Sequence, residues 1–363
     1  MGRDFRQVLE LLPEGWETKA KELGALQRAR AIKTPEDLLK LILLYLTEGK
    51  SMAGTSAVIN LSDETAMSKI AVYKRIQNSG DWLQWLCTNI CRRAGLLTEK
   101  PLWLKDRNVL LTDGSKDVKT GKEKQSFMLH YTMDMFTFVA REFLITEEKT
   151  GEKLTNFKSF EKNDIVIADR MYGTLASLFH LKKYEADYIL RLRGGAFNIY
   201  NAKWRVIDIA KQFSRLMPSQ YDELTGWLHQ KGEIIPVRIC ALRKSKIDES
   251  KGLRRLKKES SGILLSESRK EYNKYIIVIT SLGKEVTVKQ VLDLYRARWQ
   301  VELAFKRLKS LFGYNEMPAR KPENIKTWFY GKLLLATLCE TLVNTGRFGG
   351  STETQPEKKT SRS

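Results

Sequence analysis

Apolar residues recur at helical spacing through the first hundred residues of the chain. The run Thr34-Pro35-Glu36-Asp37 has the composition of a helix start, with a threonine cap, a proline at the first helical position and acids in the first turn. An amphipathic stretch continues from it to Leu46, and Trp82 opens a further helix. The pattern therefore predicts an all-helical region over residues 1–100.

The pattern changes after Pro101, where short apolar runs rich in β-branched and aromatic residues replace the helical spacing. Residues 108–114 have a buried-strand pattern ended by a turn, and residues 165–169 form another apolar strand. We also expect strands at 127–137, 138–147 and 188–192, and a helix at 174–183. Three strands that can pair as a meander, followed by a strand–helix–strand unit, predict an α/β core with a mixed sheet.

Beyond residue 194 the chain returns to β-like pieces, of which 234–242 and 275–282 are the clearest. The stretch between them, 243–274, carries six more basic than acidic residues. We interpret this stretch as a solvated loop, and contact with phosphates is a reasonable addition to that interpretation.

A long helix is expected in the last quarter of the chain. Thr287 and Gln290 form a capping box at its start, and the pattern continues to about Phe312. A further helix covers about 328–343, and the polar tail from Arg347 has the composition of disordered chain.

Two short helices within the first hundred residues, at 51–59 and 63–78, are separated by a brief polar break. The second ends in Tyr73, Lys74 and Arg75, and the pair resembles a helix-turn-helix unit that contacts DNA. An ordinary helical hairpin fits the same pattern, and the sequence does not decide between the two.

The chain has 363 residues, of which 42% are hydrophobic, and a formal net charge of +20. This length predicts two or three folding units, and the hydrophobic content excludes a largely disordered protein. Because such a charge opposes compaction through self-repulsion, it indicates a polyanionic partner, most often nucleic acid. A basic protein without such a partner is the alternative.

Four cysteines and three histidines are the candidates for zinc or disulfide chemistry. Cys87 and Cys91 lie four residues apart in a helical stretch, and no cysteine pair has the spacing of a zinc site. We interpret the cysteines and His130 as core or surface residues. The N-terminus does not have the pattern of a signal peptide, and no apolar stretch is long enough to span a bilayer. We therefore expect a soluble cytoplasmic protein with no membrane partner.

Four polar residues on the long helix share one narrow stripe. At about 100° per residue, a spacing of 0, 3, 7 and 14 keeps side chains on one side of a helix over about four turns. The residues with this spacing are Tyr295, Arg298, Glu302 and Lys309. A solvated helix face explains such a stripe, but a tyrosine within it and Trp299 beside it favour a functional interpretation.

Two aspartates, Asp113 and Asp169, each close an apolar strand of the predicted core. Such an aspartate is often only a turn former, yet the carboxyl ends of strands are also where α/β sheets place ligand groups. Together with Glu302 they make three acids able to bind two divalent cations. Oxygen ligands suit Mg²⁺, and two such ions can clamp the attacking and leaving oxygens of a phosphoryl transfer.

The stripe on the long helix matches the signature Y-x2-R-x3-E-x6-K at every fixed position, and Asp169-Arg170-Met171-Tyr172 looks like a D-R-x-Y motif around the second acid. On these motifs the chain resembles the DDE transposases of bacterial insertion sequences, in particular the insertion sequence 4 family. The resemblance spans about residues 108–343 and is looser over the first hundred residues.

The resemblance implies a ribonuclease H-like fold, with Asp113 on the first strand, Asp169 just after the fourth and Glu302 on a late helix. It also implies a mostly β insertion between the second and third acids. We therefore expect five parts in chain order: a helical DNA-end-binding region (1–100), the first part of the catalytic core (101–193), the insertion (194–286), the remainder of the core with a C-terminal helix (287–345) and a disordered tail (346–363).

The implied activity is cut-and-paste DNA transposition, in which the three acids bind two Mg²⁺ or Mn²⁺ ions for cleavage at the transposon ends and strand transfer into target DNA. Tyr295, Arg298 and Lys309 would hold phosphates near the transposon terminus. The implied partners are double-stranded DNA, as terminal inverted repeats and as target, and a second copy of the chain in a homodimeric synaptic complex. The place of action would be the bacterial nucleoid.

Three further arginines are candidates for DNA contact. Arg170 follows the second acid, and Arg191 and Arg193 alternate on one strand face, where they could equally be solvent-facing. Some relatives trap a flipped base on a tryptophan of the insertion. Trp204 and Trp227 lie in the corresponding region, and for both we favour core packing.

Two alternatives remain from the sequence. Full-length relatives usually continue past the last helix into a segment that pairs protomers, whereas this chain runs into a polar tail. A truncated, catalytically impaired transposase that binds DNA as a repressor of transposition is therefore one alternative. A nuclease of the same fold that acts without transposition is the other.

Overall fold

The structure is a computed structural model in which the chain divides into two compact units, residues 1–97 with 323–363 and residues 98–322. It describes residues 2–28, 30–47, 51–62, 67–93, 99–120, 125–147, 150–260, 264–311 and 321–344. Within helices and strands, it describes only the backbone at 2–4, 62, 115–120, 125–127, 145, 259, 300–311, 322, 340 and 343–344.

In the first unit, the described residues form helices and the segments that join them. Its helices are α1 (Gly2–Glu10), α2 (Trp16–Glu22), α3 (Pro35–Thr47), α4 (Met52–Ser62), α5 (Lys69–Asn78), α6 (Gly80–Arg93) and α12 (Pro322–Asn344). The predicted helix start at Thr34 is confirmed, because its hydroxyl accepts a hydrogen bond of 3.1 Å from the Asp37 amide. The predicted N-terminal helical region is likewise confirmed.

Helix α12 packs within this helical unit although it lies more than two hundred residues further along the chain. The Thr327 hydroxyl donates to the Ile76 carbonyl over 2.8 Å, and the Lys332 ammonium donates to the Leu46 carbonyl over 2.7 Å. Gly331 lies so close to Leu46 that a side chain there would collide with it. The five-part division drawn from the sequence stays a prediction.

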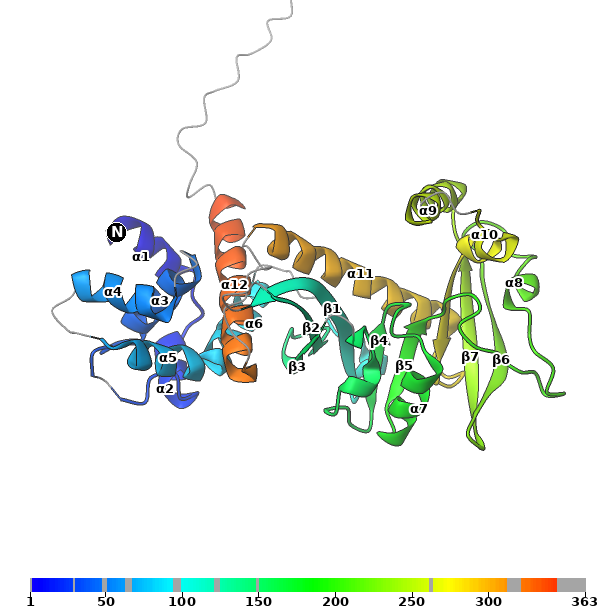
Figure 1. Cartoon of the computed structure of the whole chain (residues 1–363), viewed down its shortest axis with the longest axis horizontal. Coiled ribbons are helices and arrows are strands. Elements are labelled where there is room, and N and C mark those ends of the chain that lie inside the picture. Colours follow the sequence, from blue (N-terminus) through cyan, green and yellow to red (C-terminus); the bar gives the residue numbers. More distant parts are fainter. Residues whose placement is uncertain are drawn as a thin grey trace, which may run out of the picture. The chain divides into compact units, whose positions relative to one another are not determined.

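The second unit is built on one eight-stranded sheet with the order β3-β2-β1-β4-β5-β8-β7-β6 (Figure 1). Its strands are β1 (Asn108–Thr120), β2 (Gln125–Asp134), β3 (Ala140–Glu147), β4 (Asp164–Ala168), β5 (Asp187–Arg191), β6 (Tyr221–Gln230), β7 (Glu233–Arg243) and β8 (Tyr275–Thr280). Strands β1, β4 and β5 are parallel, and the other neighbours pair antiparallel. The predicted mixed sheet, with the ribonuclease H-like arrangement of its core, is confirmed.

Five α-helices lie in the described part of this unit. They are α7 (Leu175–Lys183), α8 (Ile209–Gln212), α9 (Lys246–Glu259), α10 (Glu267–Asn273) and α11 (Val288–Leu311), together with short 3₁₀ turns at Leu102–Leu104 and Leu154–Asn156. All five residues of β4 are buried, as expected for a parallel strand covered on both faces. The apolar core continues from β1 and β4 through β5 and β8 into β7, so the strands of the predicted insertion extend the same sheet.

Two local predictions were wrong. The turn expected at Gly114 is absent, and β1 continues to Thr120. Its parallel pairing with β4 ends at Thr112, but its antiparallel pairing with β2 extends to Thr120. The basic stretch 243–274 contains helices α9 and α10 in place of a loop. Each helix has a serine cap, Ser245 and Ser266, whose hydroxyl accepts a hydrogen bond from the backbone of the first turn.

Candidate active site

The two predicted aspartates occupy matching places on neighbouring parallel strands. Thr112 and Ala168 are the last paired residues of the β1–β4 ladder, and Asp113 and Asp169 are the next residues of the two chains. Since neighbouring strands lie about 4.8 Å apart, the two carboxylates start from adjacent backbone positions at one edge of the sheet. Both residues are half-buried, so solvent reaches the pair.

Backbone amides and a tyrosine orient these carboxylates. Asp113 accepts hydrogen bonds from the Gly114 amide over 2.8 Å and from the Tyr131 hydroxyl over 3.4 Å. Asp169 accepts one of 2.7 Å from the Met171 amide. Each carboxylate is thus held by a backbone amide of its own segment, and Asp113 also by Tyr131 of β2, which restricts its rotation.

A buried polar chain lies behind the aspartates. The Tyr172 hydroxyl is 3.3 Å from Nδ1 of His130, and Nε2 of His130 is 2.9 Å from the Thr146 hydroxyl. Tyr172 and His130 are completely buried. Burial lowers the pKa of His130 to about 4, so its imidazole is neutral at neutral pH.

The same tyrosine is close to three acids. Burial is the main cause of the raised pKa of Tyr172, and the charges of Asp113, Glu152 and Asp169 raise it further. Gly114 leaves room for this arrangement, since an added Cβ there would lie 3.0 Å from the Tyr172 hydroxyl. The hydroxyl is therefore placed among the acids and stays protonated, able to donate a hydrogen bond.

The third predicted acid lies on α11. The backbone of this helix is described through Leu311, but the side chains of Glu302 and Lys309 lie outside the described residues. Tyr295 and Arg298 are described, and only 5% and 7% of their surfaces are exposed. The guanidinium carbon of Arg298 lies 5.1 Å from the centre of the Tyr295 ring. This part of the stripe is buried, so it is not a solvated helix face.

The three arginines predicted to contact DNA lie at or just after the ends of β4 and β5. Arg170 and Arg193 are exposed, and Arg191 is half-buried at the end of β5. A Cβ added to Gly173 would collide with the Arg191 carbonyl, so the turn after Asp169 packs directly on the end of β5. The structure thus brings Arg191 close to the turn that carries Asp169 and Arg170.

The tryptophans of the insertion differ from each other. Trp227 is half-buried in β6, whereas 51% of Trp204 is exposed. Core packing was therefore the wrong prediction for Trp204. Its backbone adopts a positive φ of 55°, and its ring centre lies 5.8 Å from the ring centre of Tyr200. Tyr200 bridges to Trp227 in the second half of β6, toward the sheet edge opposite the two aspartates.

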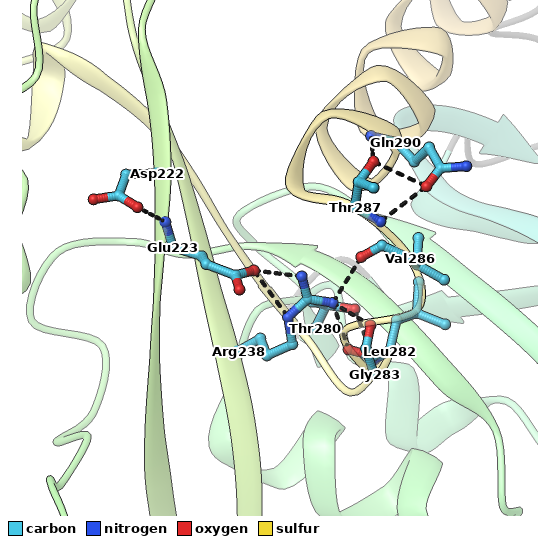
Figure 2. Close-up of polar contacts among 9 residues, drawn as sticks. All are labelled: Asp222, Glu223, Arg238, Thr280, Leu282, Gly283, Val286, Thr287 and Gln290. Atoms are coloured by element: carbon cyan, nitrogen blue, oxygen red, sulfur yellow. Dashed lines mark hydrogen bonds and ion pairs between the residues drawn. The ribbon is translucent and has the colours of Figure 1, made fainter.

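A buried arginine fastens the start of α11 (Figure 2). Nη1 of Arg238 donates to the carbonyls of Leu282 and Val286 over 2.9 and 3.0 Å, and also to that of Gly283. Its Nε donates to the Glu223 carboxylate over 3.1 Å. These contacts tie β6 and β7 to the loop that leads into α11.

The helix itself begins as predicted. Thr287 and Gln290 form the capping box, with hydrogen bonds of 2.8 Å from the Thr287 amide and 3.3 Å from the Gln290 amide (Figure 2). From this start α11 runs beside β7, β6 and β4 (Figure 1). The Arg238 contacts therefore fix the N-terminal end of α11, the helix that carries Tyr295, Arg298 and Glu302.

Sequence reasoning missed Glu152, Arg238 and the joint position of His130 and Tyr172. Tyr172 stood within the D-R-x-Y motif, three residues after Asp169, and that spacing was a usable signal. Arg238 was also visible as a single charge within an apolar strand. His130 and Glu152 gave no such signal.

The two described acids of the predicted set suit a divalent cation. Asp113 and Asp169 present oxygen ligands at adjacent positions with access to solvent, which is the donor type that Mg²⁺ prefers. Among the described side chains, no group of three or more histidines, cysteines or acids is placed to hold a metal. The side chain of Glu302, which would complete the set, is not among them. In the described part of the chain no helix has both the length and the apolar character to cross a membrane.

Comparison with known proteins identifies related chains. Residues 97–338 match the family model described as Transposase DDE domain. The transposase of insertion sequence element IS421 from Escherichia coli is 29% identical over 343 residues, which cover 91% of each chain. The transposase of element IS231C from Bacillus thuringiensis subsp. berliner is 28% identical over 199 residues, covering 49% of this chain and 41% of its own. That of element IS1151 from Clostridium perfringens is 27% identical over 221 residues, covering 55% and 45%.

Proposed function

Because the chain belongs to the transposase DDE domain family, and is thus a transposase of the insertion-sequence type that acts on DNA, we propose a cut-and-paste reaction. In it the protein cleaves DNA at the ends of its element and joins the freed 3′ ends to target DNA. The observation that carries this proposal is the position of Asp113 and Asp169, which directly follow the last residue pair of the β1–β4 ladder on neighbouring strands. Two carboxylates held side by side are suited to phosphoryl transfer.

Asp113, Asp169 and Glu302 would hold two Mg²⁺ or Mn²⁺ ions, which is consistent with the general use of divalent metals in this family. When bound, such ions activate a nucleophile and stabilise the negative charge of a transferring phosphate. The chain's own contribution is to orient the carboxylates, through the amides of Gly114 and Met171. Tyr172 adds a protonated hydroxyl among the same acids.

Tyr295, Arg298 and Lys309 would hold phosphates near the cleavage point. The Tyr295 hydroxyl is buried and has no hydrogen-bond partner among the described residues. A buried hydroxyl without a partner is unfavourable, and a phosphate oxygen would supply the missing bond. Arg170, Arg191 and Arg193 would contact the DNA backbone close by, because they lie at or just after the ends of β4 and β5, near Asp169.

The remaining parts would serve assembly on DNA. We assign binding of the terminal inverted repeats to the helical region 1–100 and synapsis to a homodimer acting in the nucleoid. The tail 346–363, expected to be disordered, lies outside the described residues. The insertion 194–286 would contribute further DNA contacts from the same sheet.

The test is a cleavage assay with Mg²⁺ on DNA that carries the sequences flanking the coding region. The wild type should nick at defined ends and join them to a target, and Asp169→Ala should do neither. Wild-type binding to these ends without metal-dependent nicking would reject the enzyme and favour the repressor. Cleavage without end preference and without strand transfer would favour a nuclease of the same fold.

A further inference from the structure

Helix α9 begins at the same sheet edge as the two aspartates. Strand β7 runs antiparallel to β8, which runs antiparallel to β5, so β7 points the same way as β1, β4 and β5. Its carboxyl end leads through Lys244 into α9, which lies with α10 beyond one end of the β6–β7 pair (Figure 1). Three strand spacings of about 4.8 Å separate β4 from β7, so α9 starts about 14 Å along the edge from Asp169.

The acids at the start of α9 are engaged within the protein. Asp248 takes part in the helix cap, where its carboxylate accepts a hydrogen bond of 2.8 Å from the Ser245 hydroxyl. The Glu249 carboxylate accepts one of 3.2 Å from Arg243, and its backbone carbonyl accepts one of 2.9 Å from the side-chain amide of Asn273. These contacts attach the first turns of α9 to β7 and α10 and use the negative charge there.

The later turns carry a basic stripe. Four exposed cations lie within an arc of about 100° around the helix axis. They are Lys251, Arg254, Arg255 and Lys258. None of the four forms an ion pair with a described residue. The face turned toward the rest of the protein, with Gly252 against Asn273, lies on another side of the helix.

Lys244 lies in the chain between β7 and α9, close to the arginines beside the acids. Its ammonium donates to the Asn273 carbonyl over 2.6 Å. Burial and the charge of Arg191 lower the pKa of Lys244 to about 8, and the charge of Arg170 lowers it further. The charges of Asp248 and Glu249 act in the opposite direction. Cations that lie close enough to lower the pKa of this lysine make a site that an anion would stabilise.

We propose that α9 and Lys244 form a second DNA-backbone surface, on which the duplex lies as it leaves the aspartate pair along the sheet edge. The stripe is about 10 Å long, which matches the rise over about three phosphates of one strand. Four unpaired cations facing outward in one line are complementary to such a row of phosphates. This inference rests on the proposed function, because it takes DNA as the substrate at that edge.

The experiment compares two variants with the same loss of charge. One replaces Lys251, Arg254, Arg255 and Lys258 with glutamine. The control replaces Lys162, Lys182, Lys183 and Lys231, exposed lysines at or next to the opposite ends of β4, α7 and β6, with glutamine. Binding of a labelled 30-base-pair duplex is measured for the full chain from 50 to 300 mM salt, together with cleavage at saturating protein.

We expect the α9 variant to bind at least about tenfold more weakly than the control. The slope of log binding constant against log salt concentration should be less steep by about 3. At saturating protein it should cleave at the wild-type rate, because no acid of the site is changed. Equal losses in both variants, with an active wild type, would overturn this inference alone. A wild type that neither binds DNA in a salt-dependent way nor cleaves it would overturn the proposed function as well.

Discussion

The hydroxyl of Tyr172 lies 3.3 Å from Nδ1 of His130, and both side chains are completely buried behind the two aspartates. Since the imidazole is neutral at neutral pH, this contact joins two uncharged groups. The hydroxyl also feels the charges of Asp113, Glu152 and Asp169. The charge of the carboxylates thus acts on a polar chain that runs from Tyr172 through His130 to Thr146.

Removing the Tyr172 hydroxyl should affect metal use more than DNA binding. Tyr172→Phe keeps the ring in the core but takes a protonated hydroxyl away from the acids, which then repel one another more strongly. We expect cleavage to require at least about threefold more Mg²⁺ and the free energy of unfolding to fall by about 1–3 kcal/mol, because His130 loses a partner. A Mg²⁺ titration of cleavage and a urea melt measure the two effects. An unchanged Mg²⁺ requirement would contradict the coupling.

His130 should make stability depend on pH below neutrality. Its pKa is about 4 in the folded protein, against about 6.5 in an unfolded chain. The unfolded state therefore binds a proton first, and stability present above pH 6.5 is lost as the pH falls toward 4. From pH 6.5 to 5 the free energy of unfolding should fall by about 1.6 kcal/mol, measured by urea unfolding. In His130→Asn this contribution should be absent, so the free energy of unfolding should fall less between pH 6.5 and 5. An identical fall in both proteins would contradict the assignment.

Glu302 should be needed for cleavage but not for binding. Glu302→Gln removes the charge of the third acid and keeps its volume, so we expect cleavage with Mg²⁺ to fall below detection. DNA affinity should stay within about twofold, because the cations that contact phosphates are unchanged. Gel-shift and cleavage assays on the same preparation measure both. Loss of both together would mean that Glu302 has a structural role.

Arg238 should position the third acid from a distance. Glu302 lies fifteen residues beyond Thr287, which is about 22 Å of helix, so a tilt of 5° at the start would move it by about 2 Å. Arg238→Lys cannot reach three carbonyls and a carboxylate together. We expect cleavage to fall at least about tenfold, with DNA binding retained and the protein folded by circular dichroism. Glu223→Gln, which keeps the guanidinium on the loop carbonyls, should have the smaller effect on cleavage, and the reverse order would contradict this role.

Local signals in the sequence predicted much of the fold. The capping box at Thr287 and the apolar run of β4 specify their elements with few residues, and both are present. Residues 243–274 were misread because composition dominated the interpretation, whereas the serine caps at Ser245 and Ser266 determine the helices. The turn expected at Gly114 failed because pairing with β2 overrides a local turn preference.

The candidate site could be predicted only where its residues stand in a motif. Asp113 and Asp169 each follow an apolar run in the sequence, and parallel pairing of those two runs places them at adjacent positions. His130 and Tyr172 are 42 residues apart, and their contact depends on the meander of β1, β2 and β3. Arg238 bonds to carbonyls 44 to 48 residues away. Such partners depend on tertiary structure, which local patterns do not contain.

DNA binding should weaken between pH 7 and 9 through Lys244. Its pKa is about 8, so raising the pH over this range removes its charge, while a bound phosphate favours the ammonium. The groups around it are Arg170 and Arg191, which disfavour the charge, Asp248 and Glu249, which favour it, and the Asn273 carbonyl. We expect duplex affinity to fall about threefold to tenfold from pH 7 to 9 at constant salt. Lys244→Arg should abolish most of this fall, because a guanidinium keeps its charge. A fall of the same size in Lys244→Arg would show that another group titrates, and a flat wild-type profile would show that Lys244 does not meet a phosphate.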